Sequence, residues 1–228
     1  MLEITQGGDR ASRHFRRDVV LLGLAAGLLS GCKIVRNGTS ATTDPQKPDS
    51  FNARAYVAQL WTPRVLPFFQ QKSADLATVL GALAKNASDA DKSFGQPPAA
   101  SGGNWTFAVK SEGKVTAVDT KSLHGTMTVA VPGVSTPVTL QIGPVVFGSA
   151  IRDCLPFLAF SDFVNQIEYA EVARALNGQA GAGIRQQLDP AKTLGRVVAF
   201  SGAMPDPAAT GAVQVTPVTM RLSGGAGQ

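Results

Sequence analysis

The side chains best suited to chemistry are concentrated between residues 141 and 171, where polar and charged groups alternate with phenylalanines. Such a mixture is typical of a surface that binds a polar ligand or a protein partner. The candidate binding residues in this segment are Gln141, Arg152, Asp153, Asn165, Gln166, Glu168 and Tyr169.

Carboxylates in the same segment raise a second hypothesis, a carbohydrate-acting hydrolase that uses Asp153, Asp162 or Glu168. On a helix, Asp162 and Glu168 are separated by about 240° around the axis. They face different directions, whereas a glycosidase needs two carboxylates flanking one bond. The structural alternative is that Arg152 and Asp153 cap or pair at a junction of barrel and helix, while the other polar residues form an exposed stripe.

Other catalytic patterns are missing from the sequence. Apart from His14 near the N-terminus, the chain has one histidine, His124, in a turn-like stretch between two expected strands. There is no G-x-S-x-G motif, and the glycine-rich residues 178–183 lack the Lys-Ser/Thr pair of a phosphate-binding loop. One histidine and one internal cysteine cannot form a zinc site. We therefore expect no catalytic residue, no metal and no cofactor.

The N-terminus has the three parts of a lipoprotein export signal. Four arginines between residues 10 and 17 precede an apolar run from Val19 to Leu29, and the signal closes with Leu29-Ser30-Gly31-Cys32. Eleven apolar residues are too few for a membrane-spanning helix, which needs about 20. We expect cleavage before Cys32 and lipid on its thiol; the alternative is an ordinary secretory signal with a chance cysteine. The Arg16-Arg17 pair leaves the export route open between the general and the twin-arginine pathways.

Charge and cysteine content exclude two further classes. Removing residues 1–31 takes away four Arg, two Asp and one Glu, which leaves 17 basic and 13 acidic residues and a net charge of +4. This mild, unclustered charge predicts no nucleic-acid partner. With Cys32 lipidated, Cys154 has no disulfide partner, and its apolar neighbours indicate a small buried residue.

The first half of the expected mature chain predicts a tether followed by helices. Residues 32–50 have the polar, Pro- and Gly-containing composition of a flexible linker. Residues 51–95 follow helical spacing, with Pro63 and Pro67 predicted to break or kink the first helix. A second helix fits residues 74–85 with Ser73 as its cap. The Gly- and Pro-rich stretch 95–103 bounds this helical subdomain.

The second half, residues 104–223, changes to strand-like periodicity. Strands are expected at 105–110, 114–119, 126–131 and 138–146, and the first two read as a hairpin turning at Glu112-Gly113. A helix over 161–177, capped by Ser161 and ended by Gly178, interrupts them; residues 179–190 then read as a loop or frayed turn. Strands at 196–201 and 214–222 follow. This order predicts an α+β fold with an OB-like barrel and an inserted helix.

The sequence resembles a family of predicted periplasmic lipoproteins of unknown function. The residues that carry the likeness are Cys32 to Val35, Phe51 to Val57, Gln141 to Val145, Ile151 to Asp153 with Leu155 to Phe157, Asp162 to Ala170 and Thr216 to Val218. The resemblance implies a helical subdomain with an OB-like barrel, a periplasmic location, and genes that commonly neighbour sugar ABC transporters. It implies no demonstrated catalysis. Cys154 departs from the family, in which a small residue such as Ala is expected.

These observations favour a non-enzymatic accessory or binding module, held at an envelope membrane through lipid on Cys32. Its expected partners are an ABC transporter component, a solute-binding protein or a sugar-like ligand. The envelope hydrolase is the competing hypothesis. A purely structural spacer is the third, and it would bind neither a specific partner nor a ligand.

Overall fold

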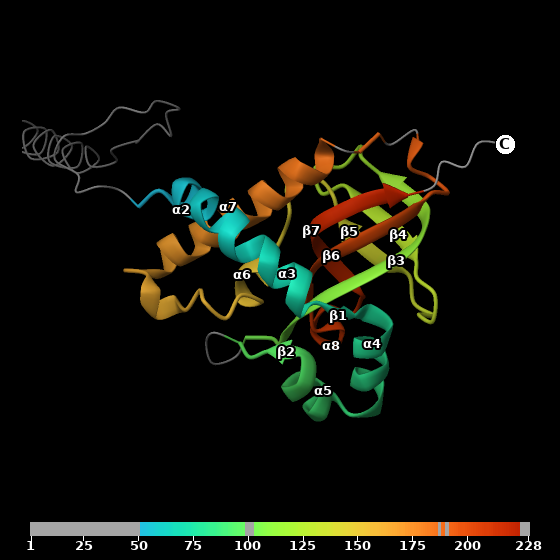
Figure 1. The fold of residues 1–228 in the computed structure, drawn as a ribbon, viewed down its shortest axis with the longest axis horizontal. Helices are drawn as coiled ribbons and strands as arrows, with labels where there is room; N and C mark the ends of the chain where they lie inside the picture. Colours follow the sequence, from blue (N-terminus) through green and yellow to red (C-terminus); the bar gives the residue numbers. More distant parts are fainter. Residues whose placement is uncertain (1–50, 99–102, 187, 190–191, 224–228) are drawn as a thin grey trace, which may run out of the picture. The chain divides into compact units, whose positions relative to one another are not determined.

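The computed structural model describes residues 51–98, 103–186, 188–189 and 192–223. The expected signal peptide, the tether and the lipid site Cys32 lie outside these residues. Residues 49–228 belong to one compact unit, in which helices pack beside a closed barrel (Figure 1). Within the described part of the chain, no helix has the length and apolar character needed to cross a membrane.

Five strands form the barrel. In spatial order they are β3 (Thr106–Asp119), β4 (Thr126–Ala130), β5 (Val138–Gln141), β7 (Gln214–Ser223) and β6 (Val197–Pro205). The pairing of β6 with β3 closes the sheet on itself, and β5 and β7 are the one parallel pair within the barrel. Alternating strand residues such as Val109, Met127 and Leu140 are buried in the interior. The α+β class predicted from the sequence is confirmed.

The expected hairpin between residues 105 and 119 is wrong, because β3 is one continuous strand of 14 residues. Its first part pairs with β6 up to Lys114, and its second part pairs with β4 from Lys114 onward. Gly113 lies at this change of partner. A Cβ at Gly113 would collide with the carbonyl oxygen of Ala130 in β4. The glycine is therefore required by close approach of two backbones and not by a turn.

The first helical segment continues through its two prolines without a break. It consists of α2 (Ala53–Leu60), the π-helical segment η2 (Trp61–Val65) and α3 (Leu66–Lys72). The backbone N–H of Leu66 bonds to the carbonyl of Trp61, five residues earlier, so the wider π-turn absorbs Pro63 where an α-turn would clash. Pro67 falls in the first turn of α3, where its missing N–H costs little. The expected interruption is thus a change of helix type.

Two short strands join the next helices to the barrel. β1 (Ala74–Asp75) runs parallel to β3, and β2 (Gly95–Gln96) pairs with it antiparallel. Between them lie α4 (Leu76–Lys85) and α5 (Ala87–Phe94). The cap expected at Ser73 is wrong: Asp75 accepts the N–H of Thr78 at 2.9 Å, and Ser73 is buried.

The long helix α7 (Gln166–Arg185) begins later and ends later than the expected span of 161–177. Ser161 lies in the 3-10 turn η3 (Phe160–Asp162), and the cap is Asn165, whose Oδ1 accepts the N–H groups of Ile167 and Glu168, both at 2.9 Å. Gly178 remains helical, so the loop expected from residue 179 is helix as far as Arg185. Two shorter helices complete the fold, α6 (Ala150–Asp153) and α8 (Pro207–Thr210).

The helices and the barrel bury two apolar clusters. One fills the barrel and includes Leu76 and Val79 of α4. The other lies outside the barrel wall, where Val57, Phe69 and Leu176 of α2, α3 and α7 meet strand residues. α2 lies alongside α7 in this second layer (Figure 1). This layer positions the segment 141–171 against one end of the barrel.

Candidate functional site

A cleft of about 460 Å³ opens at the end of the barrel where β3 and β7 begin and β5 and β6 end. Its size is suitable for a small ligand. We call it the barrel-end cleft. The lining residues that bear on its chemistry are Thr106, Gln141, Phe147, Ser149, Arg152, Asp153, Tyr169 and Gln214.

The structure brings together four of the seven residues proposed from the sequence, since Gln141, Arg152, Asp153 and Tyr169 all line this cleft. The other three lie at the start of α7 and not among the lining residues. Asn165 caps the helix, the Glu168 carboxylate accepts the N–H of Val164 at 3.2 Å, and Gln166 is exposed. Their spacing therefore reflects helix initiation.

The loop between β5 and α6 forms one wall of the cleft and is held from two sides. The Gln141 side chain accepts the N–H of Phe147 at 3.0 Å, donates to the Phe147 carbonyl at 3.4 Å and donates to Thr216 Oγ1 at 3.0 Å. From α7, Asn177 Nδ2 donates to the carbonyl of Gly148 at 2.9 Å, and Arg185 Nη1 donates to that of Gly143 at 2.9 Å. These bonds pre-organise the loop.

Asn177 and Arg185 were not among the residues expected to matter. The sequence pattern ended the helix at Gly178, which left Arg185 in a supposed loop. A buried asparagine inside a helix is itself a signal, because its amide must find partners away from the helix backbone. The partners of Asn177 are carbonyls about 30 residues earlier in the chain.

Phe147 lines the cleft, and water can reach its side chain. Its side chain is 59% exposed although it is large and apolar. The ring lies 4.0 Å from that of His124, measured between centroids. His124 is exposed in a turn, as the sequence predicted. The turn thus supports one side of the Phe147 ring.

Arg152 and Asp153 form the ion pair that was the structural alternative in the sequence. Arg152 donates to Asp153 Oδ1 from Nη2 at 2.6 Å and from Nε at 2.8 Å, while Ser149 Oγ donates to Oδ2 at 2.5 Å. Arg152 Nη1 also donates to the Tyr169 carbonyl at 3.1 Å. Both oxygens of the Asp153 carboxylate are therefore occupied, and the pair ties α6 to α7.

The floor of the cleft contains an unusual polar group. Thr106 is buried and lines the cleft, yet its hydroxyl makes no hydrogen bond of ordinary geometry among the described residues. Beside it, Cys154 is fully buried, which confirms the packing role expected for it. Burial, followed by the charge of Asp153, raises the pKa of the Cys154 thiol well above its ordinary range.

The described residues contain no cluster of three or more His, Cys, Asp or Glu side chains that could hold a metal ion. The barrel-end cleft itself offers hydroxyls, amides and one neutralised ion pair beside two aromatic rings. This set can bind a polar, uncharged molecule by hydrogen bonds and ring contacts.

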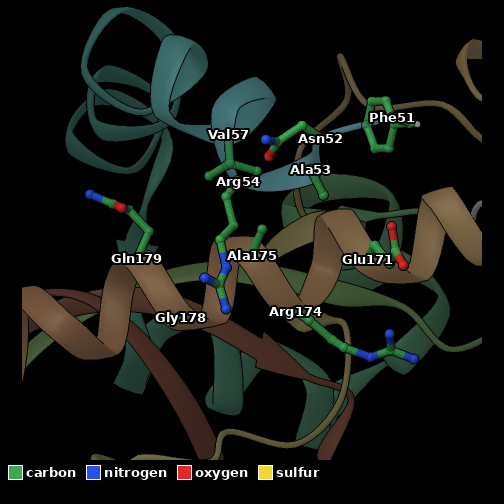
Figure 2. Close-up of a pocket in the computed structure, with 10 residues that line it drawn as sticks. All are labelled: Phe51, Asn52, Ala53, Arg54, Val57, Glu171, Arg174, Ala175, Gly178 and Gln179. Atoms are coloured by element: carbon green, nitrogen blue, oxygen red, sulfur yellow. The ribbon is translucent and has the colours of Figure 1, made fainter. Parts of the chain in front are cut away.

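A second, wider cleft of about 700 Å³ lies between α2 and α7. Figure 2 shows Arg54 reaching from α2 toward α7, where Glu171 and Arg174 extend from the neighbouring helix. Both arginines are exposed. Phe51, the first described residue of the chain, lies at one end of this α2/α7 cleft. This cleft could not be predicted from sequence, because its two walls are more than 100 residues apart.

Comparison with solved structures finds an OB-fold protein from Thermotoga maritima, which superposes with a TM-score of 0.60. The two chains share 18% identity, and the match covers 76% of this chain and 99% of the other. At this identity the likeness shows the fold alone, and it confirms the predicted OB-like barrel. No curated protein matches the sequence.

A protein-family model matches residues 22–221, nearly the whole sequence, and is described as "Predicted periplasmic lipoprotein (DUF2291)". The family has no established function. The match bears out the resemblance seen in the sequence and the periplasmic location inferred from the export signal. The chain belongs to this family of predicted periplasmic lipoproteins.

Proposed function

We propose that the protein is a non-enzymatic binding module, tethered to an envelope membrane, whose barrel-end cleft holds a sugar-like ligand. The observation that carries this proposal is the exposed Phe147, whose backbone is held by Gln141 and whose neighbour Gly148 is held by Asn177, beside buried polar groups. Sugars present apolar C–H faces and many hydroxyls. An aromatic ring next to a few well-placed hydrogen-bonding groups suits both.

The arrangement of carboxylates favours binding over hydrolysis. Of the three acids in the hydrolase hypothesis, Asp153 lines the cleft, and its two oxygens already accept bonds from Arg152 and Ser149. Asp162 Oδ2 accepts the N–H of Ala159 at 3.0 Å, so this carboxylate stabilises the turn in which Asp162 lies. A glycosidase needs two free carboxylates across one bond, and the described lining residues of this cleft include no second carboxylate.

The tethering part of the proposal rests on Cys32. Labelled fatty acid should be incorporated into the wild-type protein in cells and lost from Cys32→Ala. Incorporation that persists in Cys32→Ala would place the lipid elsewhere and overturn this assignment.

The ligand proposal is tested by thermal unfolding of the protein against a panel of monosaccharides and disaccharides. A sugar that binds the folded state should raise the midpoint. Phe147→Ala should lose this increase, while Leu194→Ala, which removes another exposed apolar side chain, should keep it. If no sugar raises the midpoint, or both variants respond alike, the barrel-end cleft is not a sugar site.

The association with a sugar transporter is the most specific part of the proposal, and it follows from the family resemblance. The lipidated protein, purified in mild detergent, should retain a transporter permease or solute-binding protein that mass spectrometry identifies. Gln214→Ala should weaken this retention if the partner delivers its sugar through the cleft, because Gln214 lines it. Retention that is independent of the cleft would separate partner binding from ligand binding.

A further inference from the structure

Three large apolar side chains are exposed around the start of α7. Val164 is 88% exposed, Ile167 is 69% exposed and Phe160 is 42% exposed. They follow one another within eight residues of sequence, across the turn that leads into the helix. We call these residues the α7 apolar patch. Exposed apolar residues gathered in one place mark an interaction surface.

The base of the α7 apolar patch is a cluster of aromatic rings that includes the first described residue after the tether. Phe51 contacts Phe163 with ring centroids 5.8 Å apart, and Phe163 contacts Tyr169 at 5.4 Å. Tyr169 in turn contacts Phe160 of the patch at 5.5 Å. The chain arriving from Cys32 therefore enters the domain at the patch.

The covalent distance from the lipid site to the domain has an upper limit. From Cys32 to Phe51 there are 19 residue steps, which span about 65 Å at most when fully extended. Since Phe51 is packed at the base of the α7 apolar patch, the lipid cannot lie farther than this from the patch. The patch therefore lies beside the point at which the chain from Cys32 reaches the domain.

Two arginines and one acid, Glu171, lie along the helix face that continues from the patch. Ile167, Glu171, Arg174 and Gly178 lie on one face of α7, because they are spaced by four, three and four residues. Arg54 reaches this face across the α2/α7 cleft (Figure 2). Long basic side chains next to exposed apolar ones are typical of segments that lie at a bilayer surface, where the cations meet lipid phosphates.

Two acids near the patch do not point to a free acidic site. The carboxylates of Asp162 and Glu168 accept the backbone N–H groups of Ala159 and Val164. They shape the turn that displays Val164.

We propose that the α7 apolar patch rests on the bilayer that carries the lipid anchor. Val164 and Ile167 enter the headgroup region, and Arg54 and Arg174 face the phosphates. The proposal rests on lipid attachment at Cys32, and it assigns the domain a fixed orientation on the membrane. It does not depend on what the barrel-end cleft binds.

The test places an environment-sensitive fluorophore on Val164→Cys in the lipidated protein, reconstituted into vesicles of phosphatidylethanolamine and phosphatidylglycerol. Cys32 is blocked by its lipid and Cys154 is buried, so the label is specific. The matched control is Leu194→Cys, since Leu194 is also a large, exposed apolar side chain, at 61%. We expect blue-shifted emission and several-fold stronger quenching by nitroxide-labelled lipids at position 164 than at 194.

A second variant tests the cause. Adding Ile167→Asp to the labelled Val164→Cys protein should reduce lipid quenching to the level of the Leu194→Cys control, without changing the unfolding midpoint. Equal lipid quenching at positions 164 and 194 overturns the proposal. Protection of position 164 from an aqueous quencher, with no quenching by nitroxide lipids, also overturns it and assigns the patch to a protein partner or a second copy. Loss of labelled lipid from the Cys32→Ala variant is measured separately. This control distinguishes a protein that lacks the anchor from one whose patch does not contact the bilayer.

Discussion

The Arg152 guanidinium lies over the ring of Tyr169, with its Cζ atom 3.7 Å from the ring centroid. The same guanidinium bonds to the Tyr169 carbonyl and to Asp153, so all of its nitrogens are engaged. A cation over an aromatic ring is attracted by the ring's electron-rich face. This contact joins α6 to α7 and sets the environment in which Tyr169 ionises.

The first prediction concerns stability at alkaline pH. Burial raises the pKa of Tyr169 above its ordinary value of 10.0, although Arg152 opposes the shift. The folded protein keeps the phenol proton where the unfolded chain loses it, so this stabilising contribution is complete below pH 10 and is lost as pH rises through the folded pKa. Urea unfolding should show a shallower alkaline loss of stability in Tyr169→Phe than in wild type. Identical slopes would contradict it.

The second prediction concerns the loop that carries Phe147. Gln141→Leu leaves the Phe147 N–H and the Thr216 hydroxyl without the amide that pairs them, and it should lower the free energy of unfolding by about 1–3 kcal/mol. Amide exchange at Phe147 should also become faster. Gln59→Leu, on the exposed side of α2, is the control and should change little. If both substitutions change the free energy of unfolding equally, Gln141 does not position the loop.

The third prediction separates folding from binding at Asn165. Asn165→Ala removes the side-chain acceptor for two helix N–H groups and should lower stability by about 1 kcal/mol. Asn165→Asp should retain stability, because its carboxylate accepts the same bonds and suits a helix N-terminus. Ligand binding measured by thermal shift should survive in both. Loss of ligand binding in Asn165→Ala without loss of stability would show that Asn165 contributes to the binding site.

The fourth prediction compares two glycines. A Cβ at Gly178 meets nothing within 4 Å, so Gly178→Ala should raise stability by about 0.5–1 kcal/mol by favouring the helix. At Gly202 a Cβ would collide with the carbonyl oxygen of Thr216 in the neighbouring strand, and Gly202→Ala should cost about 1–3 kcal/mol. Urea unfolding measures both. The opposite order of stabilities would be inconsistent with a continuous α7 and a tight β6–β7 pair.

The fifth prediction concerns Cys154. Because burial raises its pKa, the thiol is neutral and shielded, whereas alkylation requires the thiolate. Iodoacetamide should leave Cys154 unmodified in the native protein and modify it after unfolding in urea, as judged by mass spectrometry. Rapid modification under native conditions would show that the second apolar cluster opens readily.

The class of fold was predictable because strand periodicity and turn residues are local signals, whereas the boundaries depended on contacts between distant residues. Gly113 resembles a turn glycine in sequence, and only the carbonyl of Ala130 explains it. Ser161 and Asn165 are both good capping residues, four positions apart, and the sequence offers no reason to prefer the second. Gly178 resembles a helix end, but the helix continues because its far half packs on the barrel.

The candidate site was predictable only in part, because residue type is visible in the sequence whereas contacts between distant residues are not. Gln141, Arg152, Asp153 and Tyr169 were identified by residue type among aromatics, and the fold places them in one cleft. Phe147 was seen only as one of those aromatics, since its exposure follows from how Gln141 holds it. The approach of Phe51 to the start of α7 could not be inferred, because more than 100 residues separate the two rings that touch.

Closure of the barrel reduces the strand edges through which copies of the protein could associate. Each of the five barrel strands has a paired neighbour on either side over part of its length, and β1 and β2 cover part of the length of β3 that extends beyond β4. Proteins held on a membrane are confined to two dimensions and meet their own copies often. An unpaired strand edge could then pair with a strand of a neighbouring copy and extend the sheet. Closure leaves few unpaired edges among the described strands of the barrel, which limits sheet extension between neighbouring copies.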